Sequence, residues 1–213
     1  MLCPPERRAK IKSGWQNKIA AVPLPFRFWA DLSTRDFAQL DPASTVAVLP
    51  VAATEQHGPH LPLSVDQSIA DGIIASALPR LPADLPVLFL PTQQVGYSPE
   101  HVQFPGTLTL SSATVIATWI ELGECVARSG VKKLLLFNSH GGQVSLMDIV
   151  ARELRSRCGL IVYRCSWWNL PLGDVSRLTA PDPLPSIESE DKAPGSGRWL
   201  ALRANSARVT RSP

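Results

Sequence analysis

Four short apolar runs, separated by longer amphipathic segments, constrain the fold of this chain more than any other feature. They span residues 45–53, 85–90, 131–137 and 160–166. The first run is unbroken and rich in β-branched residues, which is typical of a strand buried on both faces of a sheet. Each intervening segment is long enough to form a helix that crosses back over the sheet. The alternation therefore predicts an α/β domain with a largely parallel sheet covered on both faces.

Capping and stop signals delimit the three long helices that this pattern predicts. The first opens at Asp66, where apolar residues begin a stripe at helical spacing. The second begins at Ser111 or Ser112, whose hydroxyl groups can accept hydrogen bonds from the backbone of the first turn, and it ends at Gly130. The third ends at Gly159.

The loop after the first apolar run carries side chains that can bind a metal ion. Glu55 and His57 are two residues apart, and Asp66 follows Glu55 by eleven. Pro59 and Pro62 stiffen the path by which Asp66 can fold back onto them. Carboxylate and imidazole ligands together suit zinc, manganese or iron rather than calcium. The same residues are compatible with a solvated polar loop in which Asp66 is only a helix N-cap.

A second cluster of polar residues follows the third apolar run and contains His140. Ligands of α/β sheets collect beyond the carboxyl ends of the strands. Glu55 and His57 follow the first strand and His140 follows the third, so this shared edge favours a metal site over a solvated loop. Glu100 and His101, in the long loop before the second predicted helix, could assist such a site. We interpret them as solvated loop residues.

The composition argues against several classes of protein. Hydrophobic residues make up 45% of the chain and charged residues 18%, as expected of a globular domain. No apolar run approaches the roughly 18 residues that a membrane span requires. A net charge of +3 is too small to indicate nucleic-acid binding. The four cysteines show no C-x-x-C pairing, which favours reduced, buried thiols in a cytoplasmic protein.

The two ends of the chain differ from its middle. Residues 1–26 carry mostly basic charge and no apolar signal core, which predicts a flexible basic extension. We expect the α/β domain over residues 27–178. Within residues 179–213 prolines interrupt a polar stretch that has no sustained period, and this composition predicts a disordered or divergent tail.

Three motifs occur in order along the predicted domain. They are residues 50–66 (PVAATEQHGPHLPLSVD), 104–107 (FPGT) and 138–142 (NSHGG). Together they resemble the creatininase (creatinine amidohydrolase) family of metal-dependent amidohydrolases, over roughly residues 28–172. The resemblance implies a three-layer α/β/α sandwich, a two-metal site, a small-molecule amide or peptide substrate, and assembly into a homo-oligomer.

The resemblance also implies roles for individual residues. Asp66 would bridge the two metal ions. Glu55 and His140 would complete one metal site, and His57 would belong to the other. His60 lies inside the first motif but is not an expected ligand.

Two departures from the family pattern affect the expected chemistry. Family members that act on creatinine carry a glutamate where this chain has Gly142, so we expect a different amide or peptide substrate. The family also carries a late histidine-to-glutamate motif, but this chain has no histidine after His140. Losing a proton-transfer group alone commonly costs about 10²–10⁴ in rate. We therefore expect hydrolytic activity that is absent or far below that of relatives with the motif.

Three functional hypotheses follow from these residues. The first is a metal-dependent amidohydrolase that cleaves a C–N amide bond. The second is a degenerate, non-catalytic family member that keeps the fold and part of the metal site. The third is a nucleotide- or phosphate-binding module that uses residues 138–143 at a helix N-terminus. The third is weak because this segment lacks both a Walker lysine and a dinucleotide fingerprint.

Overall fold

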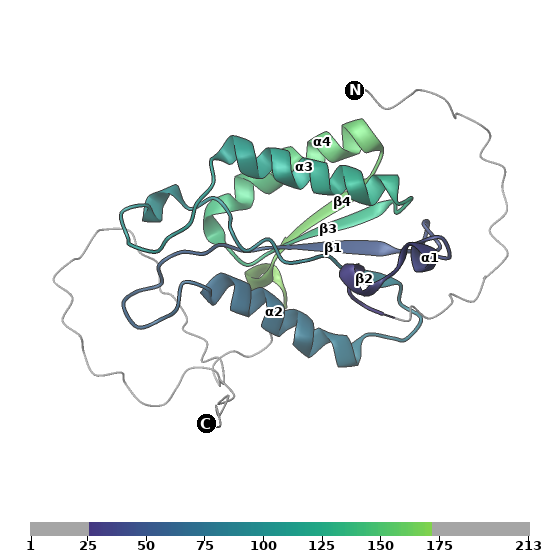
Figure 1. The fold of residues 1–213 in the computed structure, drawn as a ribbon, viewed down its shortest axis with the longest axis horizontal. Helices are drawn as coiled ribbons and strands as arrows, with labels where there is room; N and C mark the ends of the chain where they lie inside the picture. The colour runs from purple at the N-terminus through teal and green to yellow at the C-terminus, as the bar shows by residue number, and fades with distance from the viewer. Residues whose placement is uncertain (1–25, 172–213) are drawn as a thin grey trace. The chain divides into compact units, whose positions relative to one another are not determined.

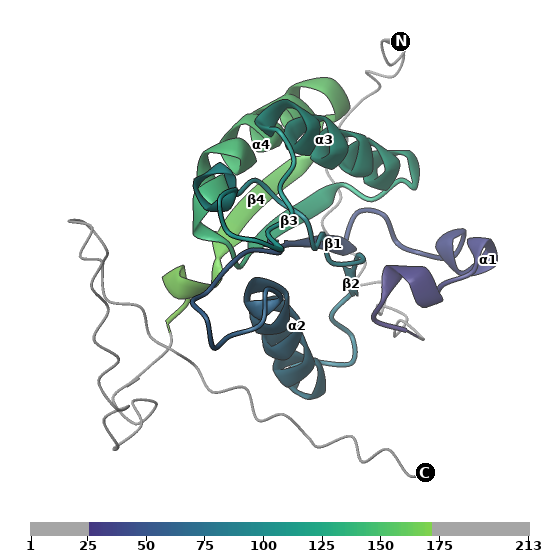
Figure 2. The ribbon, with the colours of Figure 1, turned by 60° about the vertical axis from the view of Figure 1, so that its left-hand side comes forward.

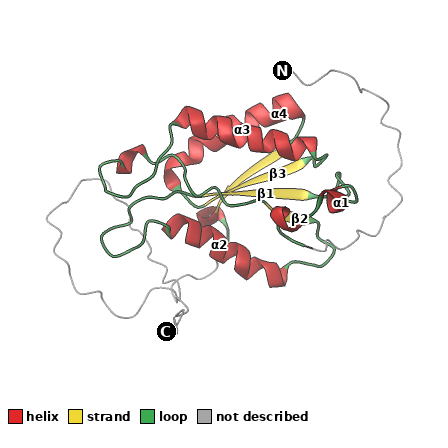
Figure 3. Ribbon diagram, viewed as in Figure 1, coloured by secondary structure: helices red, strands yellow, loops and turns green. Residues whose placement is uncertain are grey.

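A four-stranded parallel sheet forms the centre of the domain in the computed structural model, which describes residues 26–171. The strands lie in the order β2-β1-β3-β4, and every neighbouring pair is parallel. Figure 3 shows the strands in yellow between layers of helix. Their bounds are Val46–Val51 (β1), Val87–Phe89 (β2), Lys133–Asn138 (β3) and Ile161–Ser166 (β4). The predicted parallel α/β architecture is confirmed.

Helices cover both faces of the sheet and complete a three-layer α/β/α sandwich. The α-helices are Thr34–Phe37 (α1), Val65–Ala77 (α2), Ser112–Arg128 (α3) and Val144–Cys158 (α4). Figures 1 and 2 show α2 on one side of the sheet and α3 with α4 on the other. Each of the three long helices connects two parallel strands, because a parallel pair needs a crossover rather than a tight turn.

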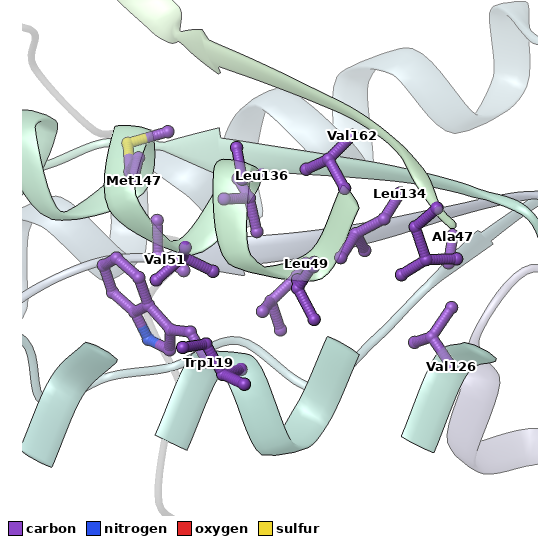
Figure 4. Close-up of a cluster of buried hydrophobic side chains, with 14 of the residues drawn as sticks. Ala47, Leu49, Val51, Trp119, Val126, Leu134, Leu136, Met147 and Val162 are labelled. Carbon is purple, nitrogen blue, oxygen red and sulfur yellow. The ribbon is translucent and has the colours of Figure 1, made fainter. Parts of the chain in front are cut away.

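The larger hydrophobic core lies between the sheet and the pair of helices α3 and α4. Alternate residues of β1, namely Ala47, Leu49 and Val51, point into it and are fully buried. Figure 4 shows them packed with Trp119 of α3 and Met147 of α4. The intervening residues of β1 face α2, so both faces of this strand are buried. This is the physical reason why its sequence is continuously apolar.

The helix signals in the sequence act largely as predicted. Ser111 is the N-cap of α3, and its hydroxyl group accepts a hydrogen bond from the backbone N–H of Thr114 at 3.2 Å. Gly159 ends α4 with a φ of +64°, and Gly130 follows α3 with a φ of +97°. Asp66, however, lies in the first turn of α2 and is buried, while Ser64 occupies the N-cap position. The interpretation of Asp66 as only a cap is wrong.

Some predictions lie outside the described residues or need correction. The basic extension of residues 1–26 (Phe26 apart) and the tail of residues 179–213 lie outside them. The apolar run 85–90 pairs as a strand over only three residues. Cys125 is exposed, although we expected buried thiols. No helix within residues 26–171 is both long enough and apolar enough to cross a membrane.

Candidate metal centre

Three buried side chains from different elements meet at the carboxyl edge of the sheet. Glu55 lies in the loop after β1, Asp66 in the first turn of α2, and His140 directly after β3. Their exposed fractions are 5%, 4% and 3%. One ligand atom from each lies within 4.8 Å of the others. In Figure 1 this edge is where the strands run into the loops drawn at the left.

The distances within the cluster show how the two carboxylates are shared between histidines. His140 Nδ1 lies 3.1 Å from Glu55 Oε1 and 3.2 Å from Asp66 Oδ2. His57 Nε2 lies 3.3 Å from Asp66 Oδ1 and 4.0 Å from Glu55 Oε1. The two oxygens of Asp66 therefore face different imidazole rings. His57 is the more exposed of the two histidines.

Backbone carbonyl groups orient both rings. A carbonyl oxygen only accepts hydrogen bonds, so the ring nitrogen beside it must carry a proton. His140 Nε2 donates to the carbonyl of Tyr97 at 2.9 Å, and His57 Nδ1 donates to the carbonyl of Glu55 at 3.1 Å. In each neutral ring the other nitrogen then presents its lone pair to the carboxylates. This arrangement is typical of metal-ligating histidines.

Buried amide side chains hold His140 in place. Asn138 Oδ1 accepts a hydrogen bond from the backbone N–H of His140 at 3.0 Å, and its Nδ2 donates to the carbonyl of the same residue at 2.6 Å. Gln143 Nε2 donates to Asn138 Oδ1 at 3.1 Å and to the carbonyl of Ala52 at 3.3 Å. Asn138 and Gln143 are both 0% exposed. Their polar groups are thus committed inside the protein, which argues against a phosphate site at residues 138–143.

The electrostatics of the cluster favour a positive charge. Burial by itself lowers the pKa of His140, but the carboxylates of Asp66 and Glu55 outweigh burial and raise the pKa to about 10. Burial raises the pKa of Asp66, yet the neighbouring imidazole groups of His140 and His57 lower it overall. The hydrogen bond with Asp66 raises the pKa of His57 against the opposing effect of burial. A proton bound at His140 thus meets the same charge requirement as a metal cation.

The residues present fit a divalent cation. Among the described residues, the buried atoms Glu55 Oε2 and Asp66 Oδ2 accept no hydrogen bond, although Asp66 Oδ2 lies close to His140 Nδ1. Lone pairs on neighbouring oxygen and nitrogen atoms repel one another unless a proton or a cation lies between them. Two ligand atoms of a tetrahedral zinc ion are roughly 3.4 Å apart. The 3.1–3.3 Å separations in the cluster are close to that value.

The structure brings a further histidine to the cluster and leaves one outside. His101 Nε2 lies 3.9 Å from Glu55 Oε2, and Glu55, Glu100 and His101 also place ligand-type atoms within 4.8 Å of one another. Our interpretation of His101 as a solvated loop residue is wrong. Its nearness to the FPGT motif at residues 104–107 was the available signal. His60 is exposed and lies outside both groups.

The absence of a side chain at Gly142 leaves room for Glu100 and His140. A Cβ atom at this position would lie 2.5 Å from Glu100 Oε1 and 2.7 Å from His140 Nε2. A Cβ atom at the neighbouring Gly141 would meet nothing within 4 Å. The missing side chain at residue 142 therefore permits the close approach of the loop that carries Glu100. This loop is tied to the first motif by a bridge between Thr54 and Leu108.

A cavity lies between residues of the first motif and of the FPGT motif. It has a volume of about 270 Å³. Its lining is mostly apolar and consists of Gln56, Gly58, Pro59, Leu63, Phe104 and Pro105. A larger cavity of about 450 Å³ lies between α2 and the β2 edge and includes none of the cluster residues. Glu55, Asp66 and His140 line neither cavity, but the smaller one is lined by Gln56, the residue that follows Glu55 in the chain.

The fold and the cluster together define an α/β protein with a candidate metal centre at the carboxyl edge of a parallel sheet. The chain belongs to the creatininase family: the family described as creatinine amidohydrolase matches residues 30–190. This agrees with the resemblance of its three motifs.

Curated relatives include a peptidase and a creatinine hydrolase. The chain is 34% identical over 152 residues to the mycofactocin precursor peptide peptidase of Mycobacterium tuberculosis, covering 68% of this chain and 57% of the relative. It is 31% identical over 138 residues to the creatinine amidohydrolase of Pseudomonas putida, covering 60% and 52%. The chain thus spans just over half the length of these relatives.

Solved structures of creatininase share the fold. A crystal structure of creatinine amidohydrolase superposes with a TM-score of 0.61 at 29% identity, covering 75% of this chain and 65% of the other. The structure titled "Creatininase Mn" has a TM-score of 0.61 at 27% identity, with 75% and 66% covered. A Zn–Zn form of a creatininase variant scores 0.59 at 26% identity, with 75% and 66% covered.

Proposed function

We propose that this chain is a metal-dependent amidohydrolase that cleaves a C–N amide bond in a peptide or another amide, rather than in creatinine. The observation that carries the proposal is the convergence of Glu55, Asp66 and His140 into one buried cluster in which Nδ1 of His140 faces an oxygen of each carboxylate. Family membership supports the reaction class. A relative named as a peptide peptidase supports a peptide substrate.

Glu55, Asp66 and His140 would hold the first cation, and His57 would contribute to a second position that shares Asp66. The opposite orientation of the two oxygens of Asp66 supports this bridging role. The ligand set suits zinc, manganese or iron. A bound divalent cation would lower the pKa of a water molecule and polarise the amide carbonyl. The carbonyls of Tyr97 and Glu55 keep both rings in the tautomer needed for this task.

The cavity beside the first motif supports a substrate with apolar groups. Pro59, Leu63, Phe104 and Pro105 form an apolar lining next to Gln56, which directly follows Glu55 in the chain. Small-molecule sites are commonly apolar with a few polar groups that orient the ligand. Gln56 is the polar side chain of this lining. An amide flanked by an apolar side chain would fit such a cavity better than a small polar ring.

The metal content of purified protein tests the proposal. We expect the wild-type chain to retain a divalent transition metal, measured as metal per chain by elemental analysis. His140→Ala should remove most of it, because the substitution deletes a buried ligand whose ring lies between the carbonyl of Tyr97 and the two carboxylates. His60→Ala is the matched control, since it removes an exposed histidine of the same loop region. Equal metal content in the two folded variants would refute the site.

The alternative is a non-catalytic family member that keeps the fold and part of the metal site and binds metal without turnover. An assay of the metal-loaded wild-type chain on a panel of amides and formamides, beside a longer relative, separates the two. Turnover within tenfold of the relative would exclude the alternative. No detectable turnover with metal bound would support it.

We further propose a cytoplasmic location and a homo-oligomeric assembly. The location rests on the absence of paired cysteine motifs. The assembly rests on the family resemblance. A single-chain mass of 23.1 kDa by light scattering would contradict the assembly.

A further inference from the structure

We propose that His101 donates a hydrogen bond from Nε2–H to the carbonyl oxygen of the substrate and does not bind metal. The inference rests on the proposed amidohydrolase function and adds a residue that neither the family motifs nor the sequence patterns assigned. His101 lies beside the candidate metal centre, on the loop between β2 and α3. The role of His101 depends on which of its ring nitrogens carries the proton.

The orientation of Gln56 determines the tautomer of His101. The backbone N–H of Gly58 donates to Gln56 Oε1 at 2.9 Å, which identifies the oxygen end of this amide. The other end, Nε2, lies 2.9 Å from His101 Nδ1. An amide NH₂ group can only donate, so Nδ1 of His101 must accept and present its lone pair to Gln56. In the neutral ring, the proton therefore resides on Nε2.

This tautomer distinguishes His101 from the two other histidines of the site. His57 and His140 donate to backbone carbonyls and turn a lone pair toward the carboxylates. His101 accepts from Gln56 and turns an N–H toward Glu55. A nitrogen that carries a proton cannot ligate a metal ion. His101 is thus a hydrogen-bond donor at the border of the centre, although its ring lies within 4.8 Å of carboxylate oxygens of Glu55 and Glu100.

The Nε2–H of His101 is positioned to meet an oxygen atom of a bound molecule. Its 3.9 Å separation from Glu55 Oε2 exceeds a hydrogen bond, and Glu55 Oε2 is buried and accepts none among the described residues. The His101 side chain is 26% exposed, so substrate can reach it. Phe104 contacts the ring edge-on at a centroid distance of 6.1 Å and belongs to the wall of the adjacent cavity.

In amide hydrolysis, His101 would supply a hydrogen bond and would not transfer a proton. When the oxygen of water attacks the amide carbon, a C–O bond forms and the carbonyl π pair moves onto the carbonyl oxygen. The Nε2–H of His101 would stabilise this oxyanion while keeping its proton. Collapse of the intermediate returns the pair, breaks the C–N bond and releases the amine, which takes the proton that water lost. Removing one such donor commonly costs about 10²–10³ in kcat.

Two variants test the inference on the full chain. We expect ¹⁵N NMR of the metal-free wild type to find the His101 proton on Nε2. Gln56→Glu replaces the donor with an acceptor and should move that proton to Nδ1. His101→Ala should keep the wild-type metal content while weakening the binding of acetohydroxamate to the zinc-loaded protein by about tenfold, the effect of one lost hydrogen bond. His60→Ala should change neither quantity.

The outcomes separate this inference from the proposed function. A wild-type chain that binds none of zinc, manganese and iron refutes the function, and with it the role of His101. A metal-binding wild type whose His101→Ala variant loses metal shows that His101 is a ligand and overturns the inference alone. A proton on Nδ1 in the wild type, or unchanged acetohydroxamate affinity in His101→Ala, also overturns it.

Discussion

Backbone and amide partners decide what each histidine of the site can do. Tyr97 and Glu55 supply carbonyls that turn His140 and His57 into potential ligands, whereas the amide of Gln56 turns His101 into a donor. Two of these partners lie far from their ring in the sequence: Tyr97 is 43 residues from His140, and Gln56 is 45 residues from His101. The site therefore depends on the exact positions of these partners. Gly142 is one example, because a Cβ atom there would collide with Glu100 and His140.

Gly142→Ala should weaken metal binding by roughly 10–100-fold, the range for disturbed partners of a metal ligand. Its Cβ would meet Glu100 Oε1, which can swing away, and His140 Nε2, which is buried and held by Tyr97. Competition with a chelator measures the affinity. Gly141→Ala is the matched control, because its Cβ meets nothing within 4 Å. Equal affinities for both variants would show that the site tolerates a side chain at residue 142.

Helix packing at the next scale depends on one close contact. Helices α3 and α4 cover the same face of the sheet, and Gly123 of α3 lies against Leu154 of α4. A Cβ at Gly123 would lie 2.3 Å from Leu154 Cδ1. Leu154 is fully buried and cannot move away without displacing its neighbours. The glycine therefore allows the two helices to approach, at the cost of weaker helix propensity.

Gly123→Ala should lower the free energy of unfolding by about 1–3 kcal/mol, as overpacked cores generally do. Gly72→Ala in α2 should raise it by up to about 1 kcal/mol, because that position is exposed and its Cβ meets nothing within 4 Å. Urea unfolding measures both. The opposite signs distinguish a packing effect from helix propensity. A stabilised Gly123→Ala variant would contradict the close packing of α3 on α4.

At the scale of the whole domain, the candidate metal centre joins segments that the sheet alone leaves separate. Glu55, Asp66 and His140 follow or begin three different elements, and the two buried carboxylates repel each other unless a proton on His140 or a metal cation balances their charge. A cation that binds the folded state but not the unfolded state stabilises the fold by mass action. The centre therefore links metal occupancy to stability.

Zinc or manganese at about 100 times its Kd should stabilise the domain by about 2.7 kcal/mol. For a domain of this size that corresponds to a rise in Tm of roughly 5–10 °C. Thermal unfolding with and without the ion measures the shift. The His140→Ala variant should show little or none of it. A comparable shift in that variant would place the stabilising ion elsewhere.

The sequence by itself determined the parallel sheet, the helix ends and the edge where the site lies. These features leave continuous or local patterns in the sequence: a strand buried on both faces requires continuous apolar residues, and Ser111 and Gly159 act on the adjacent turn. The tertiary structure decided the rest. His101 reaches Glu55, and Glu100 reaches Gly142, only because two loops pack together. The conformation of such loops is set by remote partners, and the tautomers by single hydrogen bonds, neither of which leaves a periodic pattern in the sequence.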